Sequence, residues 1–242
     1  MEAVKTILKL FPPESTGLVF RTLEEVVEKG KWKAKVGALD GLRLFVKTAK
    51  ENVANELGNT LPKVELALHD TKQEVFAIHA LVSASSNLFS SQVSSAATKC
   101  ATALCTTLAN PDLTPHIPVL VKCMSNPDQV SDCIKALSST TFVAEVTAPA
   151  LAVLVPLLAR ALNDRSMEVQ RRTVVVLDNL VKLVRDPKVA ARYLSGLVEG
   201  VAKIMDGASF PEVSSSRQTW RNGFQHSLKR LEHLLLLHTP HY

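Results

Sequence analysis

The residues in this sequence most able to do chemistry are lysines and arginines, which gather in three short stretches. Residues 29–50 contain seven basic side chains and a single acidic one, Asp40. Residues 170–192 contain six basic side chains against two aspartates, and residues 217–230 contain four with no acid. Because the whole chain carries a formal charge of only +5, the remainder is acidic and the positive charge is local. Such patches are typical of proteins that contact a polyanion, although short basic runs also occur on ordinary solvated helix faces.

Seven of these cations are candidates for binding RNA phosphates. Lysine and arginine on a rigid frame bind phosphates while the shape of the RNA supplies most of the fit. At 100° per residue, Arg171, Lys182 and Arg185 are expected on the polar side of one helix. Trp32, which lies between two of the lysines, either packs between helices or stacks on a base. The candidates are Lys31, Lys33, Lys35, Arg171, Arg172, Lys182 and Arg185.

No spacing of residues points to catalysis or to a metal. Gly30-Lys31 is the only Gly-Lys pair, and it lacks the upstream glycine and the hydroxyl residue of an ATP-binding loop. No G-x-S-x-G nucleophile turn is present. His226, His233, His238 and His241 have a spacing that suits no zinc site. We therefore expect a chain without enzyme activity, cofactor or metal.

Composition favours an all-helical protein. Aromatic residues make up only 5% of the 242 positions and there are 9 glycines, which disfavours a β-sandwich or barrel. No apolar run approaches the length of a membrane span, and the first residues are too polar for a secretory signal. The four cysteines form no C-x-x-C pair and are interpreted as reduced core thiols. The expectation is a soluble, cytoplasmic protein that contacts neither membrane nor DNA.

A repeat of 38–39 residues organises the chain. Pro118 and Pro156 are 38 positions apart, and Val130 and Val169 are 39 apart. A helix pair of this length indicates a HEAT/armadillo-like α-solenoid, in which each amphipathic pair buries its apolar side against its neighbours. A compact helical bundle is the alternative, but it would not require markers at fixed spacing. About five pairs are predicted, at roughly 15–49, 53–109, 113–146, 149–185 and 188–236.

Two segments depart from the repeat. The interval that precedes Pro118 is too long because it contains residues 76–95, FAIHALVSASSNLFSSQVSS, which carry no lysine, arginine or acid. This segment is interpreted as an irregular insertion, either a genuine loop or helix or, preferably, sequence such as a retained intron. The predicted solenoid therefore spans 1–213, and 214–242 form a divergent tail. Within the repeats, Ser166 is the predicted N-cap of a helix, and Pro156 is expected to bend another.

Several long strings closely resemble one family. They read KWKAKVGALDGLRLFVKTA at 31–49, LPKVELALHDTKQEV at 61–75, TTFVAEVTAPAL at 140–151 and LDNLVKLVRDPKVAARYL at 177–194. They resemble the N-terminal HEAT region of fungal-type translation elongation factor 3. The resemblance covers about residues 20–75 and 96–213, and it departs at the two segments that break the repeat.

The resemblance implies a module that works on the ribosome. Members of this family are cytosolic ATPases of the ABC-F type that drive release of deacylated tRNA from the exit site. Their HEAT region contacts ribosomal RNA and proteins, whereas ATP and magnesium bind to two later cassettes that are not part of this sequence. The expected partner is therefore the ribosome, and self-association is expected if the solenoid end is exposed. The alternative is a protein-binding scaffold, such as a transport receptor or an assembly platform.

Overall fold

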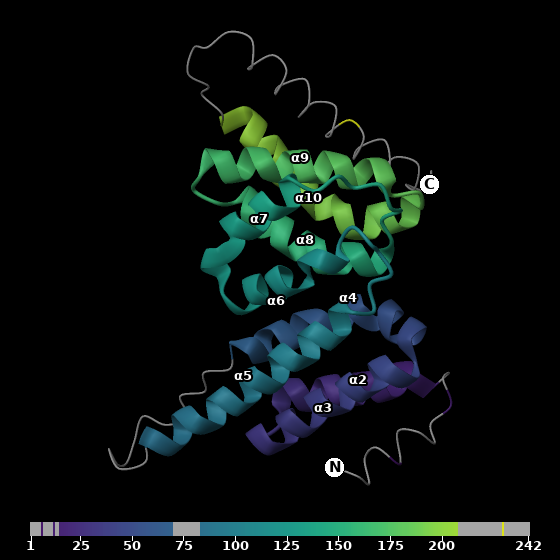
Figure 1. Cartoon of the computed structure of the whole chain (residues 1–242), viewed down its shortest axis with the longest axis vertical. Helices are drawn as coiled ribbons and strands as arrows, with labels where there is room; N and C mark the ends of the chain where they lie inside the picture. The colour runs from purple at the N-terminus through teal and green to yellow at the C-terminus, as the bar shows by residue number, and fades with distance from the viewer. Residues whose placement is uncertain (1–5, 7–11, 13–14, 70–82, 208–228, 230–242) are drawn as a thin grey trace, which may run out of the picture. The chain divides into compact units, whose positions relative to one another are not determined.

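The computed structural model describes residues 15–69 and 83–207, together with Thr6, Pro12 and Lys229. Within these residues every regular element is a helix, which confirms the predicted all-α HEAT-type fold. The chain divides into two units, residues 1–109 and residues 110–242. Each unit is a stack of helices (Figure 1). None of the described helices is both long and apolar enough to cross a bilayer.

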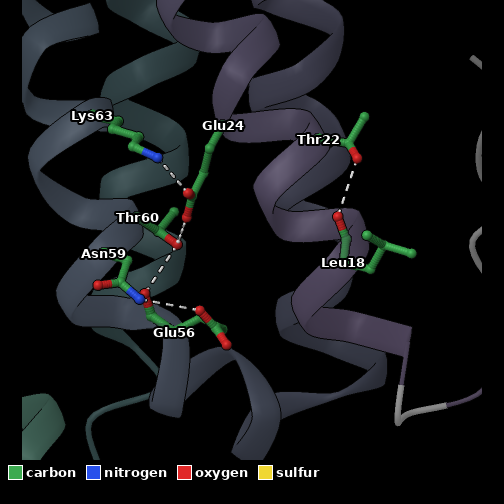
Figure 2. A network of polar contacts seen from close by, with 7 residues as sticks. All are labelled: Leu18, Thr22, Glu24, Glu56, Asn59, Thr60 and Lys63. Carbon is green, nitrogen blue, oxygen red and sulfur yellow. Dashed lines mark hydrogen bonds and ion pairs between the residues drawn. The ribbon is translucent and has the colours of Figure 1, made fainter.

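Unit 1 is built from four described helices. They are α2 (Thr16–Lys29), α3 (Trp32–Thr48), α4 (Lys50–Leu68) and α5 (Ser83–Cys105). Helix α2 packs against α3 and α4, and α5 packs against α3 and α4. Their apolar stripes meet in a core where Phe20 and Phe45 contact each other edge to face, 5.5 Å between ring centroids. A polar link also joins α2 to α4, since Glu24 accepts hydrogen bonds from Thr60 and Lys63 (Figure 2).

Unit 2 has shorter helices at its beginning. They are α6 (Ile117–Ser125), α7 (Val130–Ser138), α8 (Ala148–Leu162), α9 (Met167–Leu183) and α10 (Pro187–Gly207), with short 3-10 turns before α6 and α7. Helix α8 packs against α9 and α10, and α7 packs against α8 and α9. Ser166 is the N-cap of α9, as predicted, because its Oγ accepts a hydrogen bond from the N–H of Val169.

The first four predicted helix pairs correspond to helices α2–α3, α4–α5, α6–α7 and α8–α9. Of the fifth predicted pair, α10 is described, whereas the predicted second helix lies outside the described residues, as does most of the 214–242 tail. The marker prolines are not equivalent to one another. Pro156 lies inside α8, but Pro118 lies in the first turn of α6, where no intrahelical hydrogen bond is lost.

Within the segment 76–95, residues 83–95 form the first half of α5, a helix being one of the forms left open for the insertion. Residues 70–82 lie outside the described part of the chain. Near the middle of α5, Val93 and Ala97 are buried, and Ser94 Oγ donates a hydrogen bond to the carbonyl of Leu68, 3.0 Å away. Helical periodicity thus continues without charged residues, because small and apolar side chains every third or fourth position suffice to bury one face. That the segment is retained intron sequence stays a prediction.

Candidate nucleic-acid interface

The amino end of α3 presents two of the seven predicted cations. Lys31 is the N-cap residue and Lys33 lies in the first turn, and both are exposed. The N-cap residue makes no side-chain capping hydrogen bond, and the first turn contains no acidic residue. Trp32 is half-buried between them, with Lys33 Nζ 5.4 Å from the centre of its ring. The positive end of the helix dipole and two ammonium groups therefore share one surface, which favours an anion.

Lys35 does not belong to this surface. Its side chain is buried, with only 7% of the residue exposed, on the face of α3 that also buries Leu39 and Leu42. A residue four and seven positions before two core leucines lies on the same side of a helix as they do. Burial on this face separates Lys35 from the exposed Lys31 and Lys33.

Two of the cations on α9 pair with acids of the same helix. Arg172 Nε lies 2.7 Å from Glu168 Oε1, one turn earlier, and Lys182 pairs with Asp178 in the same way. Their side chains are 38% and 42% exposed, and Arg171 is half-buried. Because such i, i+4 pairs partly neutralise a helix face, α9 is less positive than its count of basic residues suggests.

Arg185 is not on α9, although the sequence predicted it there. The helix ends at Leu183, its C-cap Val184 is extended, and Arg185 follows in the link to α10. The Arg185 side chain is 81% exposed, and its Nη1 atom lies 3.6 Å from Oε2 of Glu145. Glu145 comes from the non-helical segment between α7 and α8, so this ion pair joins two different parts of unit 2.

The segment 140–147, which we call the α7–α8 loop, is anchored by residues that the sequence analysis did not single out. Asp112 Oδ2 accepts hydrogen bonds from the N–H groups of Val143 and Ala144, at 2.7 and 2.8 Å. Asn110 is buried and donates through Nδ2 to the carbonyl of Glu145, at 3.2 Å. The sequence Asn-Pro-Asp at 110–112 signals a turn, but it does not reveal partners more than thirty positions away.

Two further contacts hold the ends of the α7–α8 loop. Thr140 Oγ1 lies 2.8 Å from His116 Nε2, and the N–H of Val146 donates to the carbonyl of Leu183, at 3.1 Å. Leu183 is the last residue of α9, so the loop supplies a donor to one of the carbonyls that the helix end would otherwise leave without an intrahelical partner. The loop is consequently fixed to both the beginning of unit 2 and the end of α9.

Two HEAT-repeat families match parts of this chain. The family described as "EF3 N-terminal HEAT repeat" matches residues 1–80, and the family described as "Elongation factor 3/GNC1 HEAT repeat" matches residues 128–232. The chain belongs to the elongation factor 3 HEAT-repeat family. The first match begins before residue 20 and the second ends after residue 213, the two outer limits expected from the resemblance.

Relatives of known name agree with this family. The chain is 42% identical over 183 residues to "mRNA export factor elf1" of Schizosaccharomyces pombe, which is 76% of this chain and 16% of that protein. It is 35% identical over 188 residues to "Elongation factor 3A" of Saccharomyces cerevisiae, covering 78% and 16% of the two chains. It is 34% identical over 212 residues to "Elongation factor 3" of Phytophthora infestans, covering 87% of this chain and 19% of that protein. The chain thus spans less than a fifth of these relatives.

Within this elongation factor 3 HEAT-repeat chain, the two sets of predicted cations lie in different units. Lys31 and Lys33 belong to unit 1, whereas Arg172, Lys182 and Arg185 belong to unit 2. A single basic stripe that runs across both units stays a prediction.

The thiols are structural side chains of the core. All four cysteines are buried, and burial raises the pKa of Cys100 and of Cys105 to about 12. A hydrogen bond with Cys123, followed by burial, also raises the pKa of Cys133. Protonated, buried thiols are poor nucleophiles and poor metal ligands. Among the described residues no group of three or more His, Cys, Asp or Glu side chains is placed to hold a metal ion, and the four C-terminal histidines lie outside them.

Proposed function

We propose that this chain is a ribosome-associated module of an elongation factor 3-like protein, which binds ribosomal RNA and proteins. In the whole protein it supports elongation and release of tRNA from the exit site. Family membership and relatives named elongation factor 3 support this proposal. The structural observation that carries it is the amino end of α3, where Lys31 and Lys33 are exposed and the first turn contains no acidic residue.

That helix end matches the chemistry of an RNA backbone. Backbone N–H groups in the first turn of a helix point outward along its axis and favour a phosphate. Two flanking ammonium groups add Coulomb attraction without fixing a base sequence. Lys33 is kept close to the helix end by its contact with the Trp32 ring, which lowers the entropy that binding would cost.

The proposal assigns no ATP chemistry to these residues. ATP and magnesium are proposed to bind in other parts of an elongation factor 3-like protein. The purified chain is therefore expected to hydrolyse ATP no faster than a blank without protein.

Sedimentation with ribosomes at two salt concentrations tests the proposal. With about four phosphate contacts, affinity should fall roughly a hundredfold between 50 and 200 mM salt. The chain should then pellet with purified Saccharomyces cerevisiae ribosomes at the lower concentration and stay in the supernatant at the higher one. Absence from the pellet at 50 mM salt would contradict ribosome binding.

A protein-binding scaffold is the second candidate. It is favoured by the 42% identity to a relative named mRNA export factor, and by the ion pairs that neutralise part of α9. A scaffold that binds its partner through apolar contacts would respond little to salt. Binding to ribosomes that persists unchanged at 200 mM would therefore favour the scaffold over phosphate recognition.

A further inference from the structure

Arg185 differs from the other predicted cations of unit 2 in how it is held. The guanidinium of Arg172 and the ammonium of Lys182 each have a carboxylate of their own helix within hydrogen-bond distance. Arg185 is about twice as exposed as either, 81% against 38% and 42%, and its acid stands 3.6 Å away. Charge-assisted N–H···O bonds are normally 2.7–2.9 Å long. At 3.6 Å the two charges attract each other without forming a hydrogen bond of that length.

The position of Glu145 is set by the backbone of the α7–α8 loop. Its own carbonyl accepts from Asn110 Nδ2, and the N–H groups on either side of it, of Ala144 and Val146, are bonded to Asp112 and Leu183. The backbone of Glu145 therefore stays near Arg185 whether or not the two side chains are paired. Little backbone conformational entropy is lost on pairing, because the loop is already anchored.

The surroundings of this pair are positive. Arg185 lies in a run of four exposed cations that continues from the end of α9 into α10, namely Lys182, Arg185, Lys188 and Arg192. The one acid among residues 182–192, Asp186, accepts a hydrogen bond from the N–H of Lys188 at the start of α10. An anion approaching this surface meets several cations, of which Arg185 is more exposed and less closely paired than Lys182.

We propose that Arg185 binds an RNA backbone phosphate and that Glu145 is a fixed competitor for it. The inference rests on the proposed function and identifies its contact in unit 2. A phosphate offers the guanidinium two short parallel hydrogen bonds, whereas Glu145 offers a single contact at 3.6 Å. Binding exchanges the carboxylate for the phosphate, and release restores the ion pair. Glu145 thereby lowers the affinity of the module for RNA and favours its dissociation.

Removing the negative charge of Glu145 should strengthen ribosome binding. A variant that misfolds would bind less tightly, so the expected gain cannot result from misfolding. Glu145→Gln keeps the backbone contacts of the loop and deletes one negative charge. In water a unit charge at about 4 Å contributes about 1 kcal/mol, so affinity for S. cerevisiae ribosomes should rise roughly threefold to fivefold at 100 mM salt. The matched control is Glu168→Gln, which makes the same change of charge beside Arg172. We expect the control to raise affinity less than twofold.

Arg185→Ala completes a double-mutant cycle with Glu145→Gln. The single variant Arg185→Ala should weaken ribosome binding and lower the slope of log affinity against log salt by about one. In the double variant, Glu145→Gln should no longer increase the affinity. Deproteinised ribosomal RNA, used as a second probe, should reproduce the gain.

The outcomes separate this inference from the proposed function. If the native chain fails to sediment with ribosomes at 50 mM salt, the proposed function fails and the inference with it. If the native chain sediments but Glu145→Gln binds no more tightly than Glu168→Gln, only the inference is overturned. A gain that survives Arg185→Ala overturns the role of Arg185, and a gain seen with intact ribosomes but not with RNA assigns the contact to an acidic protein instead.

Discussion

Glu24 on α2 and Lys63 on α4 form an ion pair in which the carboxylate is almost fully buried. Lys63 Nζ lies 2.6 Å from Glu24 Oε2, and Thr60 Oγ1 donates to the other carboxylate oxygen at 2.5 Å (Figure 2). The Glu24 side chain is 3% exposed, whereas Lys63 is 35% exposed. A buried carboxylate is costly unless donors surround it, so these two donors fix how α2 sits against α4.

Glu24→Ala should destabilise the chain by about 3 kcal/mol, because it leaves Thr60 without its strongest acceptor and opens a small cavity. Urea unfolding followed by circular dichroism measures the change. The matched control is the neighbouring Glu25→Ala, which removes an exposed i, i+4 pair with Lys29. The control should leave the midpoint unchanged, and equal effects of the two variants would contradict a structural role for the buried pair.

Stability should fall with pH above about 9. Burial holds the pKa of Cys100 and of Cys105 at about 12 in the folded chain, against 9.0 for an ordinary thiol. Between these values the unfolded chain loses the protons and the folded chain keeps them, so rising pH favours unfolding. The contribution of each thiol is complete below pH 9, and above it declines by up to about 1.4 kcal/mol per pH unit.

Cys105→Ala isolates this effect. Other groups titrate equally in both proteins, so the loss of stability between pH 9 and pH 10 should be about 1 kcal/mol smaller in the variant, as read from urea midpoints. Parallel pH profiles for the native chain and the variant would show that this thiol ionises alike in both states.

Asp112→Ala should loosen the α7–α8 loop. The variant loses two charge-assisted hydrogen bonds to the N–H groups of Val143 and Ala144, which we expect to cost about 2 kcal/mol. Limited proteolysis should then cut within residues 140–147 faster than in the native chain. Asp128→Ala, at an exposed position beside α7, is the control and should change neither stability nor cleavage. Identical cleavage of the native chain and the Asp112 variant would rule out this anchoring.

The double variant Lys31→Ala/Lys33→Ala should weaken ribosome sedimentation without changing the urea midpoint. If both ammonium groups contact phosphates, the slope of log affinity against log salt should fall by about two. The matched control is Lys122→Ala/Lys135→Ala, which removes the same charge from exposed positions on α6 and α7. A slope that falls equally in both pairs would indicate a dependence on net charge alone.

Lys35→Met should behave in the opposite way to the Lys31/Lys33 pair. Because Lys35 is buried beside the core of α3, replacing it with an apolar side chain of similar length should leave ribosome sedimentation unchanged. Weaker binding with an unaltered urea midpoint would restore Lys35 to the interface.

Local features were predictable from the sequence. The 38–39-residue spacing indicated paired helices, and the hydroxyl of Ser166 indicated where α9 begins, because helix periodicity and capping depend on neighbours within one turn or two. The same local logic explains what the sequence left open or placed differently. The absence of charge between positions 83 and 95 left a loop or a helix open, and the structure has a helix there, which needs only a periodic apolar face. Pro118 resembled Pro156 in spacing but occupies a helix start instead of an interior.

By itself the sequence determined that this chain is a series of helix pairs of the elongation factor 3 family, and where along it the cations lie. Only the tertiary structure decided which of them face solvent, because burial depends on what packs against a helix: Lys35 is enclosed while Lys33 is free to meet a ligand. The tertiary structure also decided that Glu145 lies beside Arg185. This ion pair depends on hydrogen bonds made by Asn110 and Asp112, whose partners are distant in sequence and come close only after the helices of unit 2 have packed.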